Sequence, residues 1–216
     1  MNNKILPKVF GWMFIGLLVT FITGYFVSTN INMLLNLFTT AGLVILLIVE
    51  VGLVIFLSAR IHKMSPTTAK ICFLLYSFVT GLSFSAYFVV FELNSLILVF
   101  LITAIVFAIF AVVGMTLKLD LTKLGTYLMM ALLAILICMI VNIFLNNSTF
   151  DLIISVIGVL IFIGYTAYDV QKIVRMSDMN MLPEENLAIY GALDLYLDFI
   201  NLFVHLLQLI GNARDN

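Results

Sequence analysis

The stretch Leu187–Ile210, LAIYGALDLYLDFINLFVHLLQLI, is a long apolar segment into which five strongly polar side chains are set. At 100° per residue these side chains fall within an arc of roughly 80° on a helix. They are Asp194, Asp198, Asn201, His205 and Gln208. Each chargeable group costs about 2.5–3.5 kcal/mol to insert into a bilayer, so it normally faces a protein interior or a hydrated cavity. The stretch therefore predicts a transmembrane helix with one polar stripe turned away from lipid.

The composition predicts a membrane protein with several spans. Of 216 residues, 64% are hydrophobic and only 10% are charged, whereas a soluble protein of this size needs far more polar surface. The net charge is −1, and the ten basic residues are spread along the chain. Nucleic-acid binding requires clustered Lys and Arg, so we expect no such partner. Cys72 and Cys138 lie in apolar segments, where they are expected to be small buried hydrophobes.

Seven apolar runs are long enough to cross the ~30 Å hydrocarbon layer, which predicts an all-α integral membrane protein. A membrane β-barrel would show alternating ten-residue segments instead. Lys4 and Lys8 precede the first run as in a signal peptide, but no small-x-small cleavage site follows, so we expect this run to remain as a span. We expect residues 1–216 to form a single transmembrane domain with spans at about 9–29, 41–60, 69–90, 95–116, 124–145, 152–174 and 187–210.

The basic residues predict the orientation of these spans. With seven spans, nine of the ten Lys and Arg fall on one side of the membrane, and only Arg214 falls on the other. The positive-inside rule then predicts a cytoplasmic N-terminus and an external C-terminus, in the cell membrane if the source is a bacterium. The nine are Lys4, Lys8, Arg60, Lys63, Lys70, Lys118, Lys123, Lys172 and Arg175.

Three aspartates lie inside the last two spans. Two carboxylates brought close in a low dielectric cannot both ionise cheaply, so such a pair is expected to share a proton and act as a pH-sensitive latch. Counted from the span midpoints, Asp169 lies ~9 Å toward the cytoplasm, Asp194 ~7 Å, and Asp198 close to the centre. Depth alone pairs Asp169 with Asp194. The span boundaries are uncertain by two to four residues, so Asp198 also remains a candidate partner of Asp169. The alternative is that Asp169 only caps or tethers helices.

Two further ionisable groups lie in the second span, and two more polar groups extend the stripe of the last span. Glu50 is near the middle of its span, where it should be protonated or face a hydrated cavity. Arg60 either extends to the headgroups or reaches inward to clamp the carboxylates. Asn201 and His205 extend the polar stripe toward the outer face. A lone intramembrane histidine is more often a packing or hydrogen-bonding residue than a ligand.

An enzymatic function is not expected. Tyr168-Asp169 and the segment 191–194, Gly-Ala-Leu-Asp, resemble the motifs of intramembrane aspartyl proteases. However, Leu193 replaces the second glycine, and the downstream Pro-Ala-Leu motif of those proteases is missing. The chain also contains no Gly-x-Ser-x-Gly and no His-Glu-x-x-His. We therefore expect no catalytic residue and no cofactor.

Two blocks of sequence resemble the Bax-inhibitor-motif membrane family in its bacterial branch. They are YDVQKI at 168–173 and ALDLYLDFINLF at 192–203, and the second block is long and specific. The resemblance covers essentially the whole chain. Supporting matches are Glu50, Arg60, Gly81-Leu82-Ser83, Phe107 to Gly114, Asp120-Leu121-Thr122 and Gly125.

The resemblance implies a fold in which six helices surround a central seventh, and a pH-sensitive calcium leak. By motif position it assigns the di-aspartyl sensor to Asp169 and Asp198 and the latching arginine to Arg60. The resemblance assigns Asp194 the role of a modulator beside this sensor. The tail after Ile210 is short and lacks the basic cluster of eukaryotic members, so the resemblance does not carry cell-death regulation to this chain.

We therefore expect a Ca²⁺-leak channel, in which Ca²⁺ is the transported ion and protons set the gate. Carboxylates suit a hard cation, and Asp169 and Asp198 are the first candidates to contact it. Asp194, Glu50, Asn201 and His205 are further candidates for the path. Two alternatives remain: a proton-coupled transporter of a small solute, and a non-transporting regulator of a membrane protease or another membrane partner.

Overall fold

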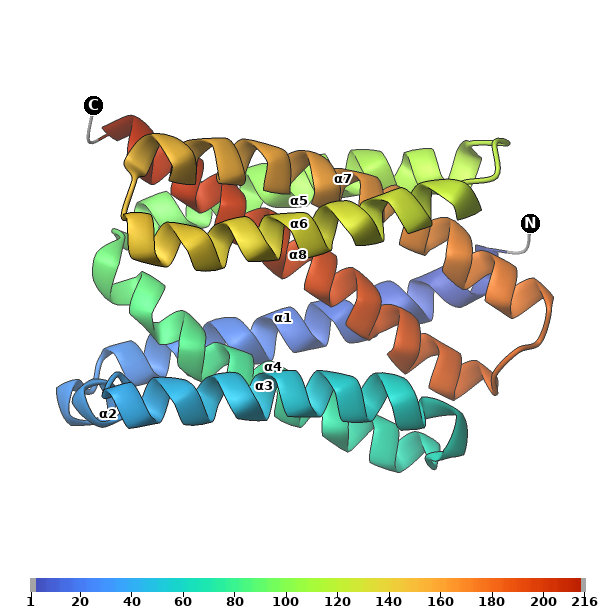
Figure 1. The fold of residues 1–216 in the computed structure, drawn as a ribbon. Coiled ribbons are helices and arrows are strands. Elements are labelled where there is room, and N and C mark those ends of the chain that lie inside the picture. The colour runs from blue at the N-terminus through green and yellow to red at the C-terminus, as the bar shows by residue number, and fades with distance from the viewer. Residues whose placement is uncertain (1–2, 215–216) are drawn as a thin grey trace. The chain divides into compact units, whose positions relative to one another are not determined.

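The computed structural model describes residues 3–214 and contains helices but no strand in that range (Figure 1). Among these residues, seven helices are long and apolar enough to cross a membrane. They confirm the seven predicted spans in order. The seven are α1 (Leu6–Ser28), α3 (Thr40–Arg60), α4 (Pro66–Val90), α5 (Leu93–Thr116), α6 (Thr122–Leu145), α7 (Ser148–Asp178) and α8 (Glu184–Arg214).

Local sequence signals determine where several helices begin and end. The side chains of Asn30, Thr39 and Ser65 each accept a hydrogen bond from a backbone N–H in the first turn of the helix that follows them. Asn146 adopts a left-handed conformation (φ 47°) and ends α6. The cap at Asn30 begins a short helix, α2 (Ile31–Leu37), in the segment between the first two predicted spans. Two 3₁₀ turns, η1 (Asn3–Ile5) and η2 (Ile61–Lys63), precede α1 and follow α3.

The contacts divide the chain into two compact units. Unit 1 consists of Met1–Ser95 and Met176–Tyr196, and unit 2 consists of Leu96–Arg175 and Leu197–Asn216. Helices α7 and α8 therefore contribute to both units. The predictions of a single domain, and of six helices arranged around the seventh, concern the whole chain and stay predictions.

In unit 1, α1 and α4 pack closely through small residues. A Cβ atom at Gly16 would lie 2.6 Å from the ring of Phe73, so this position requires glycine for the observed approach. Thr20 of α1 joins three helices, because its Oγ1 lies 2.9 Å from the carbonyl oxygen of Ser77 in α4 and 2.6 Å from the hydroxyl of Tyr196 in α8. Tyr196 is fully buried. This polar contact fixes the first half of α8 against α1 and α4.

In unit 2, α5 and α6 pack against α7. At Gly114 of α5 a Cβ atom would overlap the backbone of Ala167, and at Gly125 of α6 it would overlap the ring of Tyr168. Phe199 of α8 packs against Phe107 of α5, with ring centroids 5.5 Å apart. The matched motif residues Phe107, Gly114 and Gly125 are therefore packing positions in this unit.

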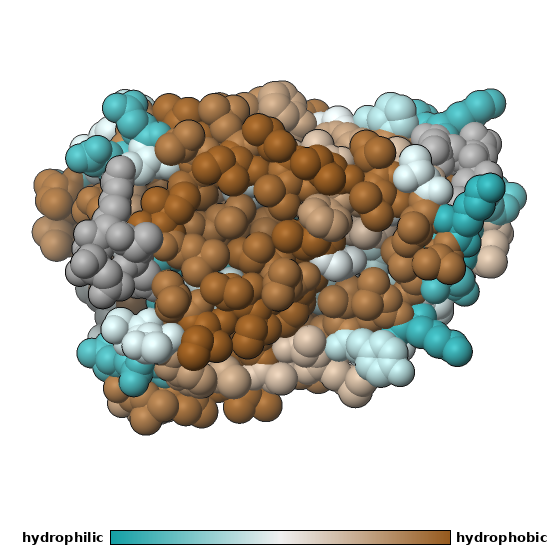
Figure 2. All heavy atoms as spheres, turned by 90° about the horizontal axis from the view of Figure 1, so that it is seen from above, coloured by the Kyte–Doolittle hydropathy of each residue, from teal (hydrophilic) through white to brown (hydrophobic). Residues whose placement is uncertain are grey.

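The surface and the burial of the helices are those of a membrane protein. Hydrophobic colour covers much of the face drawn in Figure 2, and many large apolar side chains are exposed, such as Ile143 and Val90. Exposed apolar area on this scale needs lipid around it. By contrast, 67% of the apolar stretch by which α8 would cross the membrane is buried inside the protein. The corresponding share is 11–44% in the other six spans. The last span is therefore the one most enclosed by protein.

Candidate functional site

The polar stripe of α8 meets a matching face of α7 within unit 2, and we call this contact the α7–α8 seam. On each helix the members are three or four residues apart, which places them on one face. The helices run antiparallel, because residues late in α8 contact residues early in α7. The seam comprises Ser155, Gly158, Phe162, Tyr165 and Asp169 of α7, and Asp198, Asn201, His205 and Gln208 of α8.

Two of the predicted sensor residues lie at one end of the seam. Asp169 is 5% exposed and Asp198 is 4% exposed. The charges of both carboxylates act on the hydroxyl of Tyr165, so one phenol lies within electrostatic reach of both. The structure thus places Asp169 and Asp198 in the same unit, with both charges felt by the same tyrosine. Asp194, which depth counting preferred, belongs to unit 1 and is half-buried.

A lysine that we did not predict as a site residue lies beside the sensor. The Nζ of Lys172 donates a hydrogen bond to Oδ1 of Asp169 at 3.1 Å, and the two side chains form an ion pair. The same Nζ lies 5.8 Å from the ring centroid of Tyr168. The signal was present in the sequence, because Asp169 and Lys172 are three residues apart on a helix. Lys172 is therefore a cation that pairs with Asp169 inside unit 2.

The other half of the seam is closed by aromatic packing. The rings of Phe162 and His205 stack with centroids 5.8 Å apart and planes 26° from parallel. Gly158 makes room for the imidazole, because a Cβ atom there would overlap the His205 ring. One turn further along, Oγ of Ser155 donates to Oε1 of Gln208 at 3.1 Å. Asn201 instead donates to the carbonyl oxygen of Leu197 in its own helix.

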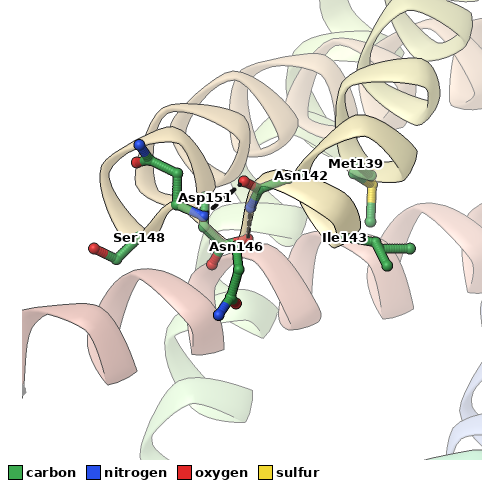
Figure 3. Close-up of a pocket in the computed structure, with 7 residues that line it drawn as sticks. Met139, Asn142, Ile143, Asn146, Ser148 and Asp151 are labelled. Atoms are coloured by element: carbon green, nitrogen blue, oxygen red, sulfur yellow. Dashed lines mark hydrogen bonds between the residues drawn. The ribbon is translucent and has the colours of Figure 1, made fainter.

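An open pocket lies where α6 turns into α7 (Figure 3). Its volume is about 630 Å³. Nδ2 of Asn142 donates to Oδ1 of Asp151 at 3.5 Å across the turn, and the amide oxygen of Asn142 accepts from the backbone N–H of Asn147 at 3.2 Å. The pocket is lined by Met139, Asn142, Ile143, Asn146, Asn147, Ser148 and Asp151.

The loop between α5 and α6 is clamped onto α7 by two side chains near the sensor. Oε1 of Gln171 accepts from the backbone N–H of Leu121 at 2.8 Å, and its Nε2 donates to the carbonyl oxygen of Leu119 at 2.9 Å. Nη1 of Arg175 donates to Oδ1 of Asp120 at 2.9 Å. The matched motif at 120–122 is therefore the part of the loop that α7 holds.

The pKa of Asp120 shows when this clamp is charged. Hydrogen bonds from the side chain and backbone of Thr122, together with the charge of Arg175, hold the pKa of the Asp120 carboxyl below its ordinary value of 3.8. A carboxyl whose pKa is lower in the folded than in the unfolded state stabilises the fold at pH values above the unfolded-state pKa. This stabilisation is lost as the pH falls through the folded-state pKa. The clamp therefore stays ionised between about pH 5 and pH 8, the range in which histidine-like switches act.

We expect Gln171→Ala to release the loop. The substitution leaves backbone groups of Leu119 and Leu121 without the side-chain partners they have in the structure, so the loop should open more often. Trypsin cleavage at Lys118 in detergent should become several-fold faster than in the wild type. Gln171→Glu keeps the acceptor for Leu121 and loses the donor, so its cleavage rate should lie between the two. Equal rates for all three proteins would show that Gln171 does not hold the loop.

The remaining predicted residues, Glu50 and Arg60, lie in unit 1. Glu50 of α3 faces Ser83 of α4, and its Oε1 is buried with no hydrogen-bond partner among residues 3–214. Arg60 is the last residue of α3 and is exposed. The predicted clamp of Arg60 on Asp169 and Asp198 would join the two units, and it stays a prediction.

Comparison with known proteins assigns the family. The sequence model of the family described as "Inhibitor of apoptosis-promoting Bax1" matches residues 2–215. An uncharacterized protein of Borreliella burgdorferi is 41% identical over 100% of this chain and 94% of its own length. The inner membrane protein YbhL of Escherichia coli K12 is 39% identical over 97% of this chain and 92% of its own length. An uncharacterized membrane protein of Streptococcus pyogenes serotype M1 is 35% identical over 76% and 72% of the two chains. The chain therefore belongs to the Bax inhibitor family of membrane proteins, as its two motif blocks predicted.

Proposed function

We propose that the protein is a pH-sensitive Ca²⁺-leak channel of the bacterial cell membrane, with a cytoplasmic N-terminus and an external C-terminus. The observation that carries this proposal is that Asp169 and Asp198 are both buried in the α7–α8 seam, within electrostatic reach of the same Tyr165 hydroxyl. Buried carboxylates in a transmembrane bundle mark ion or proton pathways. Their oxygens are the ligands that a hard divalent cation prefers.

The side chains of the seam suit a passing ion better than a tightly bound one. In the part of the chain that the structure describes, no group of three or more His, Cys, Asp or Glu is arranged to hold a metal ion. A tight Ca²⁺ site uses six to eight oxygen ligands, whereas conduction needs binding that is weak enough for release. One or two carboxylates in contact with a passing cation satisfy the second requirement.

Gating in this proposal follows from the number of protons on the two carboxylates. When the pair shares a proton, Tyr165 and Lys172 face one negative charge, and when the proton leaves they face two. Lys172 pairs with Asp169, so loss of the proton changes the charge that this ion pair faces. The seam then changes its contacts between α7 and α8, with Arg60 as the proposed latch. A local change of charge on a two-state element is the general form of such switches.

The test is Ca²⁺ flux into proteoliposomes, measured against pH. We expect the wild type to show a pH-dependent flux and Asp169→Asn/Asp198→Asn to lose that dependence, because the two amides do not titrate. Glu92→Gln removes an exposed carboxylate between α4 and α5 and serves as the matched control with an unchanged profile. An unchanged pH profile in the double variant would contradict the sensor assignment.

The same experiment separates the other readings of the site. Flux that requires a gradient of a small solute, with no Ca²⁺ movement in its absence, would identify a proton-coupled transporter. A protein that leaks at no pH and copurifies with a membrane protein would identify a non-transporting regulator. We propose no covalent chemistry for the site, because transport and gating need only charge and packing.

A further inference from the structure

We propose that the stacked rings of Phe162 and His205 are the closed gate of the ion path in unit 2. This inference rests on the proposed leak function and adds to it the place where the path is blocked. The gate lies between the Asp169 and Asp198 pair and the end of unit 2 at which α6 turns into α7.

The position of the gate is the same when counted along either helix. His205 follows Asp198 by seven residues on α8, and Phe162 precedes Asp169 by seven residues on α7. Seven residues are two helical turns, or about 10 Å. Because the helices run antiparallel, both rings lie at the same distance from the carboxylates and on the same side of them. The stacking of the two rings confirms this register.

The two rings form a close-packed block across the polar seam. Phe162 is 5% exposed and His205 is 3% exposed, and Phe162 also packs against Tyr165, with ring centroids 6.1 Å apart. The phenyl ring offers no oxygen ligand to a cation that is losing its hydration shell. Hydrophobic constrictions of this kind gate channels by excluding water. The carboxylate end of the seam is therefore separated from Ser155 and Gln208.

Packing, rather than hydrogen bonding at Nδ1, holds the imidazole in place. Nδ1 of His205 is buried and has no hydrogen-bond partner within the described part of the chain. The ring fills the space that Gly158 leaves open. Gln208, one turn further along α8, accepts a hydrogen bond from Ser155 and lies within hydrogen-bond reach of the imidazole. The imidazole can therefore leave its position without breaking a hydrogen bond at Nδ1, and its polar interaction with Gln208 is with a residue of its own helix.

Little charge surrounds the gate. Asp151 of α7 is the charged group that acts electrostatically on His205, and it lies at the α6–α7 turn. The α5 segment Leu93–Thr116, whose Phe107 packs on the same half of α8, contains no charged residue. The block therefore depends on the close packing of the two rings and on the apolar phenyl ring of Phe162.

The first test is Ca²⁺ flux into proteoliposomes at the pH at which the wild type leaks least. Phe162→Ala and His205→Ala should each raise this basal flux several-fold. Gly158→Ala should do the same, because its methyl group displaces the imidazole without altering either ring. Leu160→Ala on the same helix removes a side chain that is 63% exposed and is the matched control. Basal flux unchanged in all three gate variants would overturn the proposal.

The second test measures the access of water to the seam. It does not depend on the alanine variants of the first test, so it still applies if those fold poorly. Asn201→Cys and Gln208→Cys are introduced separately after Cys72→Ala and Cys138→Ala, and a charged methanethiosulfonate is added to each side in turn. From the α6–α7 side, Gln208→Cys should react and Asn201→Cys should not. Adding Phe162→Leu, which keeps an apolar side chain of smaller size, should make Asn201→Cys reactive. Equal reactivity at both positions before this change would overturn the gate.

The two proposals fail in different ways. A wild type that transports no Ca²⁺ at any pH overturns the leak function and the gate with it. A wild type with a pH-dependent leak, together with gate variants that leak no more than Leu160→Ala, overturns the gate alone.

Discussion

Gly114→Ala is expected to lower the midpoint of thermal unfolding in detergent by about 2–12 °C. A Cβ atom at this position would overlap the backbone of Ala167, and a backbone cannot move aside as the end of a flexible side chain can. Overpacking of a well-filled interior costs about 1–3 kcal/mol. For chains of this length each kcal/mol corresponds to about 2–4 °C. Helices α5 and α7 should therefore separate locally within unit 2.

The matched control is the same substitution in open space. Gly52 of α3 has no heavy atom within 4 Å of the position that a Cβ would take. Gly52→Ala should leave the midpoint unchanged or raise it, because alanine is favoured over glycine in a helix by up to about 1 kcal/mol. Differential scanning fluorimetry of the two variants and the wild type measures the effect. If both substitutions shift the midpoint equally, close packing at Gly114 is not important for stability.

Asn186→Asp is expected to destabilise unit 1 more than Asn186→Ala does. Asn186 is 2% exposed, and its Nδ2 donates to the carbonyl oxygens of Ile61 and Met64, at 2.8 and 2.9 Å. Alanine leaves these carbonyls without the amide, at about 1–3 kcal/mol for each buried group that stays unsatisfied. Aspartate adds a buried negative charge that faces two carbonyl oxygens. Loss of the amide donor and repulsion between the carboxylate and the two carbonyl oxygens then act together.

Thermal unfolding of the two variants measures the difference. Asn94→Asp changes an exposed asparagine in the first turn of α5 and should alter stability by no more than about 0.5 kcal/mol. Equal stability of Asn186→Asp and Asn186→Ala would show that the carbonyl oxygens do not depend on this amide. The substitution also bears on the proposed latch, because Asn186 holds the turn that directly follows Arg60.

Hydropathy was sufficient to locate all seven spans, because unbroken apolar runs of this length have few other interpretations. The ends were less certain. Helix α7 continues to Asp178 and α8 begins at Glu184, beyond the apolar runs, because polar residues extend a helix once it leaves the hydrocarbon layer. Asn180, with φ 50°, and Pro183 lie in the segment between the two helices. Short α2 depends on the cap at Asn30, which hydropathy does not detect.

The polar members of the candidate site could be recognised in the sequence, whereas its apolar member could not. Asp169, Asp198 and His205 are rare residue types for a membrane span, so each was recognisable. Lys172 was recognisable from its spacing to Asp169 but was assigned only to the cytoplasmic rim. Phe162 is one apolar residue among many in α7, and only its stacking on His205 distinguishes it.

Glycines show the same limit of sequence reasoning. Gly114 and Gly52 both lie within apolar helices, but one touches a neighbouring backbone and the other touches nothing. Their difference arises from tertiary packing, which no local pattern encodes.

The burial of α8 also affects how the chain is assembled in the membrane. This helix is the least apolar of the seven spans and the most enclosed by protein. Asp194 and Asp198 each cost about 2.5–3.5 kcal/mol on insertion scales, so α8 partitions poorly into lipid alone. It is also synthesised after the other six spans, which can then already shield its polar residues. We therefore expect biogenesis of the last span to depend on prior insertion of the others, which makes its integration a late and cooperative step.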